Sequence, residues 1–136
     1  MATTPRKSRI LIADDRPSSR ELLRLVLERA GYEVIEAEDG EQALDRARTG
    51  APDLILLDLQ MPGLDGYGVL AALRGDTRFQ TLPILALTAS AMRGDREKIL
   101  AAGFTDYLAK PAGPEIVRET VARLLREPPV TREETA

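Results

Sequence analysis

Short apolar runs alternate with amphipathic or charged stretches five times along the chain. The apolar runs predict strands near residues 9–14, 33–37, 53–58, 83–88 and 105–109. The stretches that follow them predict a helix after each strand. This alternation is typical of an α/β fold built on parallel strands.

Three of the predicted strands have cores made only of apolar residues, at 10–13, 54–57 and 84–87. Strands that are covered by helices on both faces have this composition, so these three should be central in the sheet. The runs Glu33–Ala37 and Thr105–Ala109 contain polar residues. Such mixed strands suit the margins of a sheet, where one side meets water.

Two of the predicted helices have an apolar face that should dock on the sheet. These faces consist of Leu22, Leu23, Val26, Leu27 and Ala30 in the first helix and of Val117, Val121, Leu124 and Leu125 in the last. The stretch 93–98 is charged and nearly free of apolar residues, so the fourth helix should be the most weakly held and able to move. Gly31, Gly50 and Gly103 follow helical stretches and are predicted as left-handed C-terminal caps.

The composition indicates one domain, because 136 residues with 43% hydrophobic content suffice for one core. We expect an N-terminal tail at 1–8, the domain at 9–126 and a disordered tail at 127–136, where two prolines and little apolar surface occur. The net charge of −3 and the lack of a long basic stretch argue against nucleic-acid binding. No apolar run has the ~20 residues of a membrane span, so a cytoplasmic protein is expected.

The chain contains neither histidine nor cysteine, which restricts the chemistry that it can perform. A metal must be held by oxygen, and a side-chain nucleophile must be a carboxylate, hydroxyl or amine. Five polar residues stand at the carboxyl ends of predicted strands, where parallel sheets bind ligands: Asp14, Asp15, Asp58, Thr88 and Lys110. This set suggests magnesium and phosphate.

The types of these residues suggest roles. Two carboxylates can hold Mg²⁺, which takes its other ligands from water and phosphate oxygens. Asp58 could therefore be a nucleophile, a ligand or both. Lys110 could neutralise charge on transferring phosphate oxygens, and Thr88 could donate its hydroxyl.

Each residue also has a purely structural interpretation. Asp14 and Asp15 alone would form a solvated turn before a helix that begins near Pro17 or Ser18. Asp65, followed by a glycine, is interpreted as a helix cap and left out of the site. Lys110 alone would be a solvated charge. The occurrence of all five residues at carboxyl strand ends favours the functional interpretation.

The chain resembles the receiver domain of two-component response regulators over about residues 9–126. The resemblance rests on four motifs in order: Asp14-Asp15; Asp58 with Met61-Pro62-Gly63-Leu64-Asp65-Gly66; Thr88-Ala89; and Lys110-Pro111. It implies a flavodoxin-like, doubly wound (βα)5 fold with a five-stranded parallel sheet in the order 2-1-3-4-5. The edge strands inferred above agree with that order.

The resemblance implies that Asp58 is the phosphoacceptor. It further implies that Mg²⁺ or Mn²⁺ is held by Asp15, by Asp58 and by the backbone carbonyl of Gln60, and by Asp14 through water. Thr88 and Lys110 would bind the phosphoryl oxygens.

Tyr107 matches the switch aromatic that turns inward when the threonine moves. The face formed by the fourth helix, the fifth strand and the fifth helix would then change and contact a downstream protein. The phosphoryl donor would be a sensor histidine kinase or a histidine phosphotransfer protein. Arg20 and Arg24 on the first helix would flank the pocket entrance on the side where the donor docks.

Some positions depart from the commonest pattern or vary in the family. Arg16 could pair with Asp15 or approach the phosphate. The sequence does not show whether this raises or lowers the affinity for the metal. Gln60 and Ser90 occupy positions that tune the phosphoryl lifetime in similar proteins. Gly113, after Lys110-Pro111-Ala112, makes a loose lead into the last helix.

We therefore expect a stand-alone receiver that signals by protein contact and is not an enzyme, with at most slow autodephosphorylation. Among receivers, the chain looks most like those of cell-cycle regulators and hybrid kinases. Two alternatives stay open, a pseudo-receiver that binds without phosphorylation and a small Mg²⁺-dependent aspartyl phosphatase. The phosphatase lacks its usual acid/base aspartate, because that position is Gln60. Dimerisation of the phosphorylated form is also left open.

Overall fold

Five parallel strands form the centre of the molecule in the computed structural model, which describes residues 7–89 and 93–126. The strands are β1 (Arg9–Ala13), β2 (Glu33–Ala37), β3 (Leu54–Asp58), β4 (Ile84–Thr88) and β5 (Asp106–Ala109). Their order in the sheet is β2-β1-β3-β4-β5, and each neighbouring pair is parallel. The predicted flavodoxin-like order is confirmed, with β2 and β5 at the edges.

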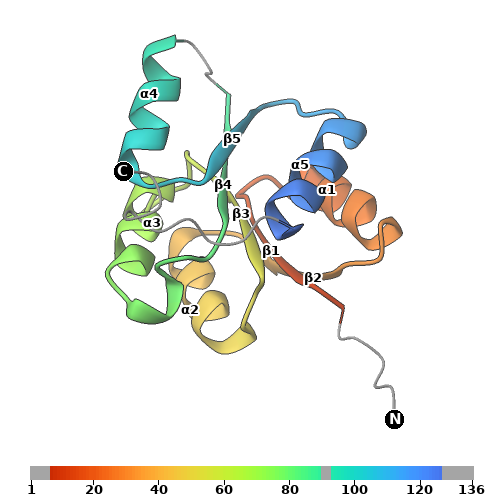
Figure 1. The fold of residues 1–136 in the computed structure, drawn as a ribbon, viewed down its shortest axis with the longest axis horizontal. Coiled ribbons are helices and arrows are strands. Elements are labelled where there is room, and N and C mark those ends of the chain that lie inside the picture. The colour runs from red at the N-terminus through yellow and green to blue at the C-terminus, as the bar shows by residue number, and fades with distance from the viewer. Residues whose placement is uncertain (1–6, 90–92, 127–136) are drawn as a thin grey trace.

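Helices cover both faces of this sheet. They are α1 (Pro17–Arg29), α2 (Gly40–Gly50), α3 (Gly66–Arg74), α4 (Arg93–Ala102) and α5 (Pro114–Arg126), with a short 3-10 helix, η1, at Thr77–Phe79. α1 and α5 lie on one side, and α2, α3 and α4 lie on the other (Figure 1). Within the described part of the chain, no helix is both long and apolar enough to cross a membrane.

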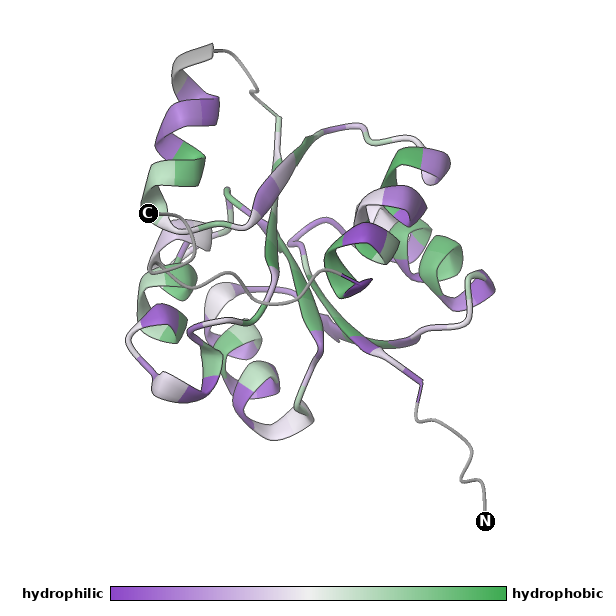
Figure 2. Ribbon diagram, viewed as in Figure 1, coloured by the Kyte–Doolittle hydropathy of each residue, from purple (hydrophilic) through white to green (hydrophobic). Residues whose placement is uncertain are grey.

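The alternation of side chains along the strands divides the interior into two cores. Ile10 and Ile12 of β1 pack with Leu27 of α1 and Val121 of α5. Their neighbour Leu11 packs on the other face, with residues of α2, α3 and α4. Every residue of β3 and β4 is buried, and Figure 2 shows these strands as mainly hydrophobic. Because the central strands are held on both sides, their carboxyl ends are fixed relative to one another.

The helix ends agree with two of the three predicted glycine caps. Gly31 and Gly103 have φ values of 96° and 117°. The prediction for Gly50 was wrong by one residue, because α2 includes Gly50 and Ala51 takes the left-handed conformation with φ 48°. A Cβ at Gly50 would lie 2.8 Å from Cδ1 of Ile35, so a larger residue there would require the end of that side chain to move.

The fourth helix has a sparse apolar face, as its sequence indicates. Among the side chains described at 95–102, Ile99 is the one that is buried. Lys98 lies over the ring of Tyr67 at 5.2 Å, and Tyr67 packs edge-on against Phe104. The predicted mobility of this helix stays a prediction, and the predicted disordered tail at 127–136 lies outside the described residues.

Candidate functional site

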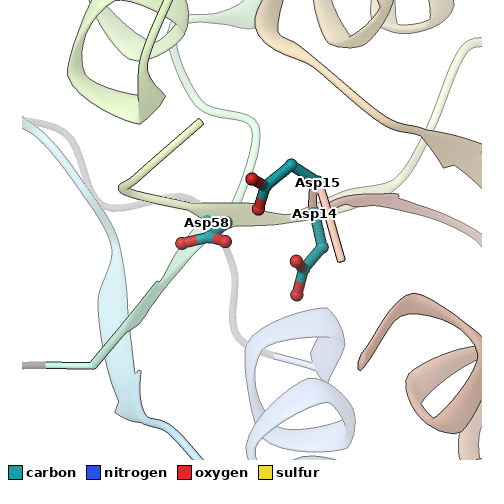
Figure 3. Close-up of side chains that lie close together, drawn as sticks. All are labelled: Asp14, Asp15 and Asp58. Atoms are coloured by element: carbon teal, nitrogen blue, oxygen red, sulfur yellow. The ribbon is translucent and has the colours of Figure 1, made fainter. Parts of the chain in front are cut away.

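Three carboxylates meet at the carboxyl edge of the sheet. Asp14 and Asp15 follow β1, and Asp58 is the last residue of β3, the neighbouring strand. One oxygen from each lies within 4.8 Å of the others, and Figure 3 shows the three side chains grouped at the ends of these strands. Asp14 and Asp58 are buried, whereas Asp15 is exposed. The topology therefore brings together residues that lie 44 positions apart (58 − 14) in the sequence.

Backbone contacts fix the two loops that carry these acids. The Asp14 N–H donates to the carbonyl of Ala37 at the end of β2, at 3.1 Å. The Gln60 N–H donates to Oδ1 of Asp58, at 3.0 Å. The start of α3 packs so closely on this second loop that a Cβ on Gly66 would lie 2.5 Å from the Asp58 carbonyl oxygen. Only glycine fits there without a shift of the backbone.

Lys110 closes the site from the end of β5. Its Nζ lies 3.0 Å from Oδ2 of Asp14 and 3.1 Å from Oδ2 of Asp58. Its own N–H donates to the carbonyl of Thr88 at 2.7 Å, which ties the loop after β5 to the end of β4. Burial alone would lower the pKa of Lys110, but the hydrogen bonds and negative charges of the two aspartates outweigh it, so its pKa is raised.

The two buried acids have opposite electrostatic environments. Burial raises the pKa of Asp58, as does the charge of Asp14, and the hydrogen bonds from Gln60 and Lys110 only partly offset this. Burial also acts on Asp14, but hydrogen bonds from the Ser19 hydroxyl, the Arg16 N–H and Lys110 outweigh it, so the pKa of Asp14 is lowered. Ser19 donates to Oδ2 of Asp14 at 2.6 Å.

The donor set fits a small hard divalent cation. All the side-chain ligands are carboxylates, one of them exposed to solvent, which matches a cation that keeps several of its waters. The Lys110 ammonium already lies between two of these carboxylates. Its position shows that the cluster requires positive charge.

Two of the acids, Asp15 and Asp58, line an open cleft of about 570 Å³. Asp15, Asp58, Gln60 and Lys110 contribute its polar wall, and Leu22 of α1 and Pro111 contribute apolar surface. Arg16 also lines the cleft, and its backbone N–H donates to Oδ1 of Asp14 at 3.0 Å. Gln60 is thus placed beside the acids as the sequence predicts, although the metal-ligand role of its carbonyl stays a prediction.

The remaining predicted residues are distributed around the site. Thr88 is buried at the end of β4. Tyr107 of the edge strand β5 is half-buried and packs against the core that α2, α3 and α4 cover. Ser90 lies outside the described residues. The interpretation of Asp65 as a cap is confirmed, because its side chain accepts a hydrogen bond from the Gly68 N–H at 2.9 Å.

Two features of the site were not predicted. The contact of Ser19 with Asp14 was missed, although a hydroxyl in the first turn of the helix that follows an acidic loop is a usable signal. Arg20 and Arg24 were expected to flank the pocket entrance. Their pairing with Glu36 of β2 was not predicted, neither is among the described residues that line the cleft, and the role in flanking the entrance stays a prediction.

Comparisons with known proteins agree with this geometry. The family model for the response regulator receiver domain matches residues 10–122. The polar-differentiation response regulator DivK of Brucella anthropi is 38% identical over 116 residues, which cover 85% of this chain and 94% of that protein. The alkaline phosphatase synthesis transcriptional regulatory protein PhoP of Bacillus subtilis is 45% identical over 118 residues, which cover 87% of this chain and 48% of that protein.

A solved structure is also similar to this chain in both fold and sequence. The receiver domain of the sensor histidine kinase PA1611 from Pseudomonas aeruginosa, with a magnesium ion coordinated in its active site cleft, superposes with a TM-score of 0.83. It is 36% identical, and the match covers 90% of this chain and all of that one. By fold, by the placement of its acidic cluster and by these similarities, the chain belongs to the response regulator receiver domain family.

Proposed function

We propose that Asp58 accepts a phosphoryl group from a phosphohistidine of a partner protein. The observation that carries this proposal is the joint placement of three carboxylates and the Lys110 ammonium at one edge of the sheet. Asp58 lies beside both the Lys110 ammonium and the Gln60 N–H. It also borders the open cleft, through which a donor can reach it.

The transfer forms a bond between a carboxylate oxygen of Asp58 and phosphorus and breaks the bond from phosphorus to the donor imidazole nitrogen. The imidazole leaves with the electron pair of that bond. A divalent cation, when bound by Asp15 and Asp58 with help from Asp14 and the Gln60 carbonyl, neutralises the negative charge of the phosphoryl oxygens. The Lys110 ammonium does the same from the protein side and stays within reach of the product.

The phosphorylated site also provides a switch. The new group adds about −1.5 to −2 charges and three acceptor oxygens, which attract the hydroxyl of Thr88 and the ammonium of Lys110. Because Thr88 and Tyr107 belong to neighbouring strands, a shift of Thr88 changes the space beside the Tyr107 ring. The α4–β5–α5 face then presents a different surface to a downstream protein.

This proposal predicts a simple chemical result. Incubation with acetyl phosphate and Mg²⁺ should give one added phosphoryl group by intact mass, and Asp58→Asn should abolish it. A matched control, Asp65→Asn, should retain it, because Asp65 serves only as the cap of α3. No adduct in the presence of Mg²⁺ would contradict the proposal and support a non-phosphorylated binder. Rapid multiple turnover of the donor would support an aspartyl phosphatase instead.

A further inference from the structure

We infer that Arg20 and Glu36 form a brace that positions the Asp14-Asp15 loop, so that Arg20 is a positioning residue for the acidic cluster. The brace joins three elements: the loop after β1, helix α1 and the edge strand β2. This inference rests on the function proposed above, because it assigns a role toward the cation and the phosphoryl group.

Arg20 makes two contacts through two different nitrogens. Its Nη1 donates to the main-chain carbonyl of Asp14 at 2.8 Å. Its Nε donates to Oε1 of Glu36 at 3.2 Å. The Arg20 side chain is 15% exposed. A planar guanidinium held at two points in this way has little freedom, so the position of the carbonyl depends on the position of Glu36.

The backbone of Asp14 is thereby attached twice to the end of β2. Its N–H bonds directly to the carbonyl of Ala37. Its carbonyl is linked through Arg20 to Glu36, the residue before Ala37. The N–H belongs to the peptide plane before Asp14 and the carbonyl to the plane between Asp14 and Asp15, so the Arg20 link is the one that holds the latter plane.

The orientation of that peptide plane is important because of Asp15. Its side chain is exposed, and no hydrogen bond or ion pair holds it among the described residues. Asp14, by contrast, is held through its side chain by Ser19 and Lys110. The position from which the Asp15 side chain reaches the cluster is therefore set by its backbone, which fixes the Cα–Cβ bond. Partners that orient metal ligands typically change metal affinity by about 10–100-fold when they are removed.

The neighbouring arginine provides a natural comparison. Arg24 pairs with the other oxygen of Glu36, with Nε at 3.6 Å, and with Glu28 at 4.0 Å. It shares the acid with Arg20 but makes no described contact with Asp14. If the brace acts through the Asp14 carbonyl, removal of Arg20 and removal of Arg24 must have different effects on the site.

The test compares Arg20→Met with two controls. Arg24→Met removes a cation from the same glutamate. Arg9→Met removes an arginine that also pairs with a β2 glutamate, Glu33, and donates to a carbonyl, that of Gly50, at the opposite end of the sheet. Mg²⁺ affinity is measured from amide chemical shifts in a titration, the rate of phosphorylation from intact mass with acetyl phosphate, and stability from urea denaturation.

We expect Arg20→Met to weaken Mg²⁺ binding by about tenfold and to slow phosphorylation, and we expect both controls to stay within about twofold of the wild type. The amide shifts of Asp14 and Asp15 should change in Arg20→Met even without Mg²⁺. Equal Mg²⁺ affinity in Arg20→Met and the wild type, or an equal loss in all three variants, would overturn the brace. If Arg20→Met does not fold, Glu36→Gln takes its place, and its Mg²⁺ affinity and rate of phosphorylation are compared with those of the same two controls.

The two hypotheses can fail separately. A wild type that neither binds Mg²⁺ nor forms the phosphoryl adduct contradicts the proposed function. A wild type that does both, beside an Arg20→Met variant that matches the controls, contradicts only the brace.

Discussion

Nζ of Lys110 lies 3.1 Å from Oδ2 of Asp58, although the two residues are 52 positions apart in the sequence. The same nitrogen lies 3.0 Å from Oδ2 of Asp14. One ammonium thus holds together two buried carboxylates that would otherwise repel each other. The stability of the domain and its affinity for cations are linked through this contact.

Replacement of Lys110 by Met should destabilise the metal-free protein by about 1–3 kcal/mol, because it leaves two buried carboxylates without their cation. Mg²⁺ should then stabilise this variant more than it stabilises the wild type, since the added cation relieves the uncompensated repulsion. Urea denaturation with EDTA and with Mg²⁺ measures both effects. Lys98→Met is the control, because Lys98 is exposed. An equal Mg²⁺ effect in wild type and Lys110→Met would contradict this account.

Asp58→Asn should have the opposite effect on the metal-free protein. Burial raises the pKa of Asp58 above its ordinary value of 3.8, so its ionised form costs stability at neutral pH. The variant should be more stable than the wild type at pH 7, because the asparagine places no charge in this buried position. Thermal denaturation in EDTA measures the difference.

The pH dependence of this gain has a definite sign. The cost of the charged Asp58 is fully present above its folded pKa and disappears as the pH falls through that value towards 3.8. The advantage of Asp58→Asn should therefore vanish in acid. Asp14 changes the stability in the opposite direction. Its pKa is lowered, so its charged form contributes stability, and this contribution is lost only as the pH falls through the lowered value. A constant difference between variant and wild type from pH 7 to pH 3 would refute the assignment to Asp58.

Arg74 should contribute to stability without contributing to the site. Its guanidinium donates to the carbonyls of Phe79, Leu82 and Gly103, which joins the end of α3 to the segments before β4 and β5. Arg74→Met should lower the free energy of unfolding by about 1–3 kcal/mol because the partly buried hydrogen bonds to the carbonyls of Phe79 and Leu82 are lost. Chemical denaturation tests this. Arg78→Met should leave stability nearly unchanged, because Arg78 pairs with Asp76 at the surface, where water screens the pair.

Ala51→Gly should stabilise the domain. Ala51 has φ 48°, a left-handed conformation that costs an L-residue with a Cβ about 1 kcal/mol and costs glycine almost nothing. We expect a gain of about 0.5–1 kcal/mol in the free energy of unfolding, measured with urea. The matched change Ala30→Gly should give no gain, because this residue caps α1 in a right-handed conformation with φ −81°. A gain in both variants, or in neither, would contradict the explanation.

The division into central and edge strands and the acidic cluster could be predicted because both depend on simple patterns, whereas the full strand order came from the resemblance to receiver domains. Unbroken apolar runs distinguish central strands from edge strands, and polar residues after parallel strands converge at one edge. These two rules suffice to bring Asp15, Asp58 and Lys110 together. The structure confirms that these groups meet, within hydrogen-bond distance for Lys110 and Asp58.

The details that the sequence did not reveal depend on long side chains and on single-residue shifts. The contacts of Arg20 with Glu36 and with the Asp14 carbonyl join three elements, and no local pattern encodes which acid an arginine reaches. The left-handed cap of α2 falls on Ala51, whereas Gly50 lies inside the helix and close to the Ile35 side chain. A glycine at a helix end thus has two interpretations, conformation and space, which only the packing separates.

The parallel sheet gives the acidic cluster one last property. Its members come from the ends of β1, β3 and β5, so the segments from Asp14 to Lys110 must all be in register before the carboxylates and the ammonium can meet. Neither half of the chain, cut between β3 and β4, contains the whole set. All three carboxylates lie in the first half and Lys110 lies in the second, so the contact of Lys110 with the two buried aspartates reports native assembly, and two complementary fragments would regain it only by associating.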